Sequence, residues 1–426
     1  MRGLCCCTRL LLALAVLLPI TALADSLSDR LYDAAGIELA GFYDLRAGTR
    51  LQGDPLEKQL SLADGRMRLE LDREWDAAIL AFKGDLLADG VTESVDLEVR
   101  ELSLSASPLD FLDVKAGRAT FTWGTGDLIF INDTFAKDWQ SFFIGRNDEY
   151  LKRPENGIKL SFFSDLADLD IIYMPLFEGS RFITGNRLSY FNPATGSLAG
   201  QDSQVIRDQP DRWFRDDALH LRLSRTLASV ELALYGYMGY WQEPEGFDPL
   251  AGQAFFPRLN VYGGSVRGAL WGGIANVELG YYDSRDNTDS RNPLIRPSEW
   301  RVLAGYEHEL AHELTGSIQY YLESIHNYVN YRQALPTDME PRDHNTSTLT
   351  LRLTQLALEQ NLVLSLFVYY SPDRDDGYAR PKFSYKITDQ WQVDGGFNLF
   401  WGQHQSTFWG QFENNTNIFC GLRYSF

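Results

Sequence analysis

The sequence predicts an all-β fold, a transmembrane antiparallel β-barrel of about 18 strands (16–18). Two observations lead to this fold class: apolar and polar residues alternate with a period of two along most of the chain, and long and short connections follow one another regularly. The 426 residues are 44% hydrophobic and 13% aromatic, with 35 glycines, and no apolar run after the N-terminal segment reaches the length of a membrane helix. If the chain crosses a membrane, it therefore crosses as strands.

The alternation is clearest in residues 362–370, where Leu364 and Leu366 share one face and Ser365 and Phe367 share the other. Segments of this kind have about ten residues with aromatics at their ends, as in membrane-spanning barrels with an apolar band outside and polar residues inside. The 18 candidate strands are centred near residues 42, 66, 82, 99, 115, 160, 171, 221, 234, 266, 278, 304, 318, 350, 366, 383, 396 and 421.

The connections supply a separate argument for the barrel. Short connections are expected at 73–76, 164–168, 225–228, 272–273, 309–313, 356–361 and 388–390, and long ones at 119–156, 175–217, 241–258, 283–298, 324–344 and 402–415. Bacterial barrels have short periplasmic turns and long extracellular loops. Both ends of the chain are therefore expected to leave the barrel on the periplasmic side.

The N-terminus has the pattern of a secretory signal peptide, expected at 1–24. Arg2 and Arg9 supply the positive charge, residues 10–20 form an apolar core too short to span a bilayer, and Ala22–Ala24 is a small-residue cleavage site. Residues 25–426 then form a single barrel domain. Three of the four cysteines lie in this leader, which leaves Cys420 and no disulfide framework.

The closing segment carries Leu422, Tyr424 and Phe426 on one face. This pattern resembles the C-terminal assembly signal of Gram-negative outer-membrane proteins. The resemblance implies insertion by the outer-membrane assembly machinery, with outer-membrane lipid and lipopolysaccharide as the surroundings.

A second resemblance rests on Gly117-Arg118, Trp123-Gly124, Asp127 and Asn132-Asp133. This segment is similar to the alginate-export type of outer-membrane barrel and to related porin-like barrels. The resemblance implies an 18-stranded monomeric pore with loops folded into the lumen. Residues 119–156 are the candidate lumen-folded loop, because their many apolar side chains need a surface to pack on; an external cap formed with 175–217 is the alternative.

The predicted inward faces carry charges of both signs in nearly equal number, whereas an exporter of an anionic polysaccharide is expected to have a strongly basic lumen. Such charges either pair across strands or select solutes at a constriction. Candidate lumen charges are Arg222, Arg267, Arg301, Arg352, Lys382 and Asp394. Candidate constriction residues are Arg118, Asp127, Asp133, Lys137, Arg146, Glu149 and Lys152.

Catalytic and metal-binding motifs are weak. Residues 308–312 match the H-E-x-x-H zinc motif, but strand patterns flank them, so a turn is expected in place of the helix the motif needs. The remaining histidines are scattered and no nucleotide-binding loop is present, so we expect no enzyme, no metal and no cofactor. The formal charge of −19 argues against nucleic acid as a partner.

Together these observations predict an outer-membrane channel for the passive passage of small polar or charged solutes, or for export of a saccharide. Acidic outer loops predict a mild preference for cations. The alternative is a closed barrel that serves as a binding or structural partner of an envelope export or lipid-handling system.

Overall fold

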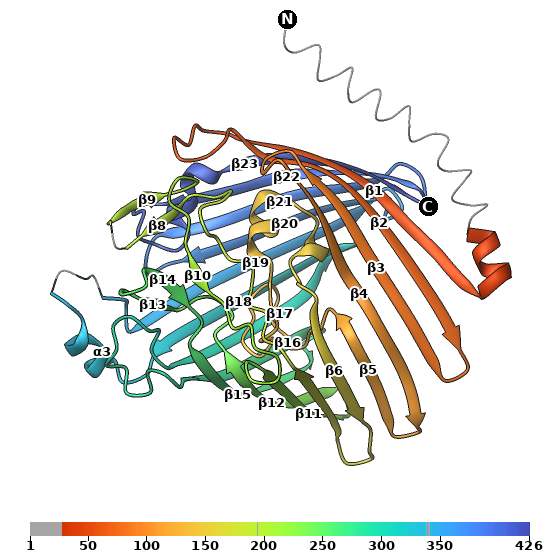
Figure 1. The fold of residues 1–426 in the computed structure, drawn as a ribbon, viewed down its shortest axis with the longest axis horizontal. Helices are drawn as coiled ribbons and strands as arrows, with labels where there is room; N and C mark the ends of the chain where they lie inside the picture. Colours follow the sequence, from red (N-terminus) through yellow and green to blue (C-terminus); the bar gives the residue numbers. More distant parts are fainter. Residues whose placement is uncertain (1–27, 194, 338, 340) are drawn as a thin grey trace, which may run out of the picture.

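The structure is a computed structural model that describes residues 28–193, 195–337, 339 and 341–426. The expected signal peptide at 1–24 lies outside these residues. Within the described chain, 18 antiparallel strands form one sheet that closes on itself, because β1 pairs with both β2 and β23 (Figure 1). Every other wall strand pairs with the wall strands before and after it in the chain. The predicted barrel is therefore confirmed.

Each predicted strand centre falls inside a wall strand, because a ten-residue alternation is a local property of the sequence. The wall strands are β1 (Ile37–Arg50), β2 (Leu60–Trp75), β3 (Ala78–Asp89), β4 (Ser94–Leu109), β5 (Leu112–Ala119), β6 (Glu155–Phe162), β7 (Asp168–Met174), β11 (Ala218–Leu227), β12 (Val230–Tyr240), β15 (Arg258–Leu270), β16 (Gly273–Ser284), β17 (Glu299–Ala311), β18 (Leu314–Ile325), β19 (Asn345–Ala357), β20 (Leu362–Ser371), β21 (Asp376–Lys386), β22 (Trp391–Gly402) and β23 (Asn417–Ser425).

The smaller elements lie in the loops at the end of the barrel where the long connections are. These are α2 (Trp139–Ile144), η1 (Asp148–Tyr150), β8 (Tyr190–Asn192), β9 (Ser197–Ala199), β10 (Arg207–Asp208), β13 (Gly246–Asp248), β14 (Gln253–Phe255), α3 (Tyr328–Ala334) and η2 (Gly410–Asn415). The helices that the structure describes are all too short or too polar to cross a bilayer.

The strand β17 differs from its predicted end. Residues His308 to Ala311 continue the strand: His308, Glu309 and Ala311 pair with β18 around a bulge at Leu310, and His312 and Glu313 form the turn. The prediction that all five residues of the H-E-x-x-H segment form a turn is therefore wrong. A helix would bring the two histidines of the zinc motif together on one face, whereas the extended backbone of this segment keeps them apart.

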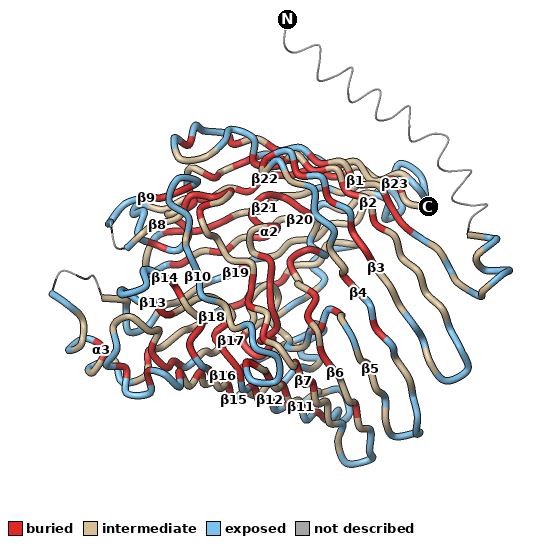
Figure 2. The backbone as a smooth tube through the Cα atoms, viewed as in Figure 1, coloured by how far each residue is buried: buried red, intermediate tan, exposed pale blue. Residues whose placement is uncertain are grey.

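The two faces of the wall differ in the way the alternation predicts. Leu364 is 44% exposed on the outside, whereas Phe367 and Tyr369 on the same strand are each 4% exposed and face inward. Exposed Trp75 lies beside a short turn, and exposed Trp271 lies within one. Figure 2 shows buried backbone concentrated on the segments inside the barrel. An apolar outer surface with aromatics at its edge is the surface that a bilayer requires.

Candidate functional site

The loop between β5 and β6, residues 120–154, packs against the inner wall of the barrel and is called the lumen loop below. Phe142, Phe143 and Ile144 of helix α2 are at most 1% exposed and share one apolar cluster with Tyr378 and Phe419 of the wall. The first part of the loop joins a second cluster, on the inner faces of β7 to β17. Figure 2 shows α2 as buried backbone among the strands. The apolar residues of this loop are therefore covered by the lumen wall.

Glu278 of β16 holds the start of the lumen loop. Its carboxylate is 1% exposed and accepts hydrogen bonds from Gly126 N at 2.7 Å, Thr125 Oγ1 at 2.8 Å and Asn132 Nδ2 at 2.9 Å, and also from two further backbone amides. Trp123 Nε1 donates to the Asn132 carbonyl at 2.8 Å, which closes the segment on itself. The segment that resembles the alginate-export type of barrel therefore folds around the carboxylate of Glu278.

Asp127 extends the contact to the next strands. Its carboxylate pairs with the Arg352 guanidinium of β19, with Arg352 Nη2 to Oδ1 at 2.7 Å. Gln319 of β18 hydrogen bonds both the amide and the carbonyl of Asp127, each at 2.9 Å. Tyr369 of β20 donates to the Leu128 carbonyl at 2.6 Å. The loop therefore reaches the wall opposite the strands from which it starts.

Arg146 anchors the far end of the lumen loop. Its guanidinium lies 2.6 Å from Asp64 of β2 and 3.1 Å from Asp89 of β3, and the residue is 7% exposed. Burial disfavours the charge on this guanidinium, but Asp64 and its neighbouring carboxylates outweigh burial, so the pKa of Arg146 lies above its ordinary value. Arg187, from residues 175–217, also reaches Asp89 at 2.5 Å. Burial and the nearby Arg146 lower the pKa of Arg187 to about 10.

Glu149 lies between two arginines of the wall. Its carboxylate is 2.7 Å from Arg68 and 2.6 Å from Arg423. Burial opposes the negative charge, but the two arginines outweigh burial, so the pKa of Glu149 lies below its ordinary value. The neighbouring Asp148 pairs with Arg380 at 2.8 Å and is 59% exposed at its side chain, so it is among the most accessible charges of the loop.

The other candidate residues also have partners. Arg118 pairs with Glu178 at 2.8 Å, Lys137 with Asp133 at 2.9 Å, and Lys152 donates to Thr122 at 2.6 Å. Among the candidate lumen charges, Asp394 pairs with Arg46 at 2.6 Å, Lys382 lies 3.7 Å from Asp148, Arg301 pairs with Glu299, and Arg267 stands opposite Glu231 across β12 and β15. Of the candidate constriction residues, Asp133, Lys137 and Arg146 are buried, and their ion pairs lie within the loop or between the loop and the wall.

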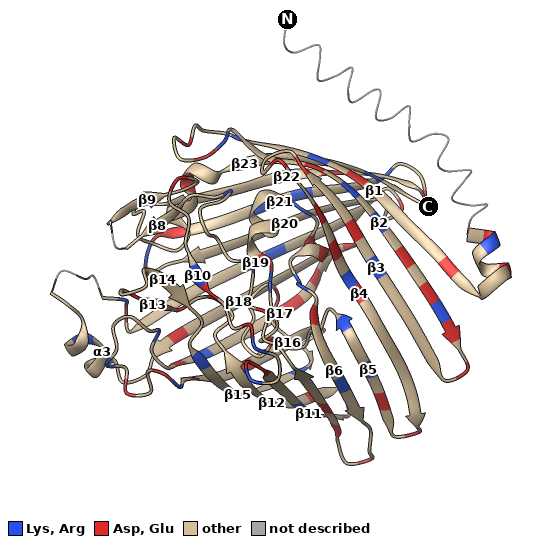
Figure 3. Cartoon of the chain, viewed as in Figure 1, with Lys and Arg blue, Asp and Glu red and all other residues tan. Residues whose placement is uncertain are grey.

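A row of charges, the charge ladder, follows the inner wall from β2 to β12. Its members are Glu70, Lys83, Glu101, Lys115, Lys159, Asp170, Arg222 and Glu231. Neighbours of opposite sign lie within ion-pair distance, for example Lys115 and Glu101 at 2.7 Å, but Lys115 and Lys159 are direct cross-strand partners. Figure 3 shows both signs of charge along these strands. Like charges in register repel, so this step of the ladder is the least compensated.

Sequence reasoning missed the part that residues 175–217 play in this site. Glu178, Arg181 and Arg187 pair with the lumen loop or with the wall below it. No periodic pattern marks these residues, because they belong to irregular backbone. The sequence offers one signal for them, the position of three charged residues early in a long loop.

Nothing in the described chain forms a metal centre, since no group of three His, Cys, Asp or Glu side chains there is placed to hold an ion. His220, on β11, is fully buried; its Nδ1 lies 3.0 Å from Thr134 Oγ1 and its ring stacks on Phe135 at 4.3 Å. This histidine packs the lumen loop against the wall.

A closed antiparallel barrel with an apolar outer surface and a charged inner surface defines an outer-membrane β-barrel. No protein-family model and no curated protein matches the sequence. Among solved structures, the outer membrane channel DcaP of Acinetobacter baumannii is similar over 92% of this chain and 97% of its own, with 10% identity and a TM-score of 0.44.

Two further solved structures are similar in the same way. A loop-deletion mutant of OmpT, an outer membrane protein of Vibrio cholerae, covers 92% of this chain and 99% of its own, with 11% identity and a TM-score of 0.43. A mutant of the Rh. blastica porin covers 92% of this chain and 100% of its own, with 11% identity and a TM-score of 0.40. Neither the fold nor the function assigned to this chain rests on these similarities.

Proposed function

We propose that the protein is a porin-like channel of the outer membrane, in which the lumen loop narrows a water-filled passage for small polar or charged solutes. The charge ladder supports this proposal. The side chains of Lys83, Lys115 and Lys159 are 34–36% exposed although they point into the barrel. Ammonium groups are strongly hydrated, so a lumen that leaves them exposed holds water.

The charges that line the lumen favour small solutes of either sign, or neutral ones, over a long polyanion. The ladder has four cationic and four anionic members, and apart from the Lys115–Lys159 step neighbours have opposite signs, so no single sign dominates this part of the wall. Export of a saccharide is the narrower form of the proposal, and the near balance of charge supports a neutral saccharide better than a polyuronate such as alginate.

Planar-bilayer recording tests the proposal. The protein should conduct ions, with a mild preference for cations at low salt that fades as salt rises, because the outer turn 372–376 carries Asp373, Asp375 and Asp376 against Arg374 alone. Replacing residues 128–147 with a short glycine–serine linker should raise the conductance. A conductance that is the same with and without this segment contradicts the narrowing role of the loop.

One observation favours the alternative of a closed barrel. Hydrogen bonds or ion pairs of the lumen loop reach β1 to β4, β11, β15, β16, β18 to β21 and β23, which is most of the wall. If the intact protein does not conduct while the loop-deleted variant does, a closed barrel that serves an envelope export or lipid-handling system replaces the channel.

Biogenesis belongs to the same proposal. Cleavage of the leader and insertion by the outer-membrane assembly machinery would place the barrel in its membrane. Phe426 closes the seam of the barrel, since its amide and carbonyl each hydrogen bond Gly41 of β1 at 3.0 Å. The Tyr424 ring packs against Trp391 in a tilted arrangement, with 4.8 Å between the ring centroids. These contacts support a role for the last strand in closing the barrel, whichever machinery inserts it.

A further inference from the structure

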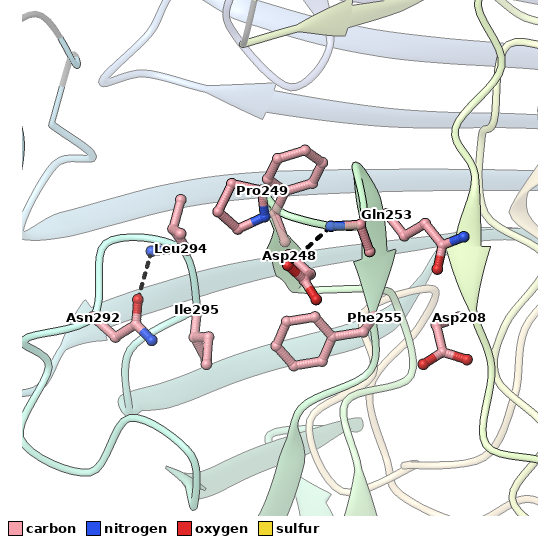
Figure 4. Close-up of a pocket in the computed structure, with 10 residues that line it drawn as sticks. Asp208, Asp248, Pro249, Gln253, Phe255, Asn292, Leu294 and Ile295 are labelled. Atoms are coloured by element: carbon pink, nitrogen blue, oxygen red, sulfur yellow. Dashed lines mark hydrogen bonds between the residues drawn. The ribbon is translucent and has the colours of Figure 1, made fainter.

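Three extracellular loops build a cavity of about 480 Å³ at the outer end of the barrel (Figure 4). Strand β14 pairs with β13 of its own loop and with β10 of the loop 175–217, and Gly246 bridges to Ile295 of the loop 285–298. The cavity is lined by Asp208, Phe247, Asp248, Pro249, Ala251, Gln253, Phe255, Asn292, Leu294 and Ile295. Its size falls within the range of small-molecule sites.

The cavity is preformed. The Asp248 carboxylate accepts hydrogen bonds from Leu250 N at 2.8 Å and Ala251 N at 3.2 Å, which fixes the turn of the β13–β14 hairpin. Behind the cavity, Arg296 Nη2 pairs with Glu299 of β17 at 3.0 Å. The loops are therefore tied to the barrel wall, and a ligand would meet a shape that needs little ordering.

The lining combines apolar surface with unused polar groups. Phe247 is 41% exposed, and the Phe255 ring lies between Ile295 and Asp208 in Figure 4. Within the part of the chain that the structure describes, the side chains of Asp208 and Gln253 have no hydrogen bond or ion pair. Carboxylates accept and amides both accept and donate hydrogen bonds, so these groups match hydroxyl groups of a ligand.

We propose that this cavity binds a neutral sugar unit at the outer mouth of the barrel. A pyranose ring has an apolar C–H face that packs on an aromatic ring and hydroxyl groups around its rim that hydrogen bond carboxylates and amides. No Lys or Arg is among the lining residues, whereas Asp208 and Asp248 are. A uronic acid would bring a third carboxylate to this site and is therefore rejected.

This site lies outside the lumen, so its test does not depend on ion conduction. The full chain is purified in a polyoxyethylene detergent, because maltoside detergents carry a competing sugar, and titrated with maltose or with glucuronate by calorimetry and saturation-transfer NMR. Maltose should bind saturably, with a Kd of about 1 mM, and glucuronate should not bind.

Two substitutions with matched controls test the residues. Phe247→Ala should weaken maltose binding about tenfold, because the sugar loses an aromatic face. Asp208→Asn should admit glucuronate while changing the maltose Kd less. Phe408→Ala and Asp202→Asn change an exposed phenylalanine and an exposed aspartate of other outer-loop positions and should leave binding unchanged.

The inference has clear contrary outcomes. Heat-modifiable mobility of each variant confirms that the barrel is folded before the titrations are compared. Absence of maltose binding to the folded protein, equal binding of maltose and glucuronate, or full affinity in Phe247→Ala overturns the proposed site. None of these results bears on whether the lumen conducts, which the bilayer recordings decide.

Discussion

Replacing Glu278 with alanine should release the start of the lumen loop while leaving the barrel closed. The carboxylate accepts five hydrogen bonds from Thr125, Gly126 and Asn132, and the side chain contributes nothing to the pairing of β16 with its neighbours. Hydrogen bonds to a charged group contribute about 1.5–3 kcal/mol each, but the freed donors regain water in the lumen. We therefore expect the local free energy of opening to fall by about 3 kcal/mol, the equivalent of one or two such hydrogen bonds.

Hydrogen exchange measures this change directly. The amides of Thr125 and Gly126 should lose protection by about a hundredfold or more, because each 1.4 kcal/mol is a factor of ten. Conductance in planar bilayers should rise and become noisier. The heat-modifiable mobility of the barrel should remain, since the strand pairing is intact.

Glu307→Ala is the matched control. Glu307 lies on the same wall, is exposed, and has no hydrogen bond or ion pair with its side chain in the described chain. This variant should change neither exchange nor conductance. Unchanged protection of Thr125 and Gly126 in Glu278→Ala would refute the anchoring role of this carboxylate, whatever the conductance does.

Three further predictions use the facing and the charges of the barrel. Leu364→Arg should destabilise the folded barrel by about 2–4 kcal/mol in a urea titration if it lies near the midplane, and Ser365→Arg far less, so equal losses would contradict the facing. Arg146→Glu should place a third carboxylate beside Asp64 and Asp89, raise the conductance and shift the reversal potential toward that of a cation-selective channel. An unchanged reversal potential would contradict a role of Arg146 in selectivity. Because the pKa of Glu149 is lowered, its anchoring persists at neutral pH and is lost only as the pH falls past the lowered value, so conductance should rise reversibly in strong acid.

The positions of the strands could be predicted from the sequence because residues that face lipid and residues that face the lumen alternate along each strand. Leu364 and Ser365 differ in polarity since one meets lipid and the other meets the lumen, and the same alternation marks every wall strand. The ends of strands were less well determined. At His308 the polar residues of a turn and of an exposed strand end look alike, and only pairing with β18 distinguishes them.

The sequence by itself determined the barrel, the inward charges and the long loop with apolar residues that need a covering surface. Only the tertiary structure decided which charges meet. Asp127 and Arg352 are joined across the lumen, and Arg146 meets Asp64, although nothing in the spacing of these residues relates them. An ion pair depends on distance in space, and a barrel brings together residues that are far apart in the chain by closing its sheet, whereas alternation depends only on the next residue along the strand.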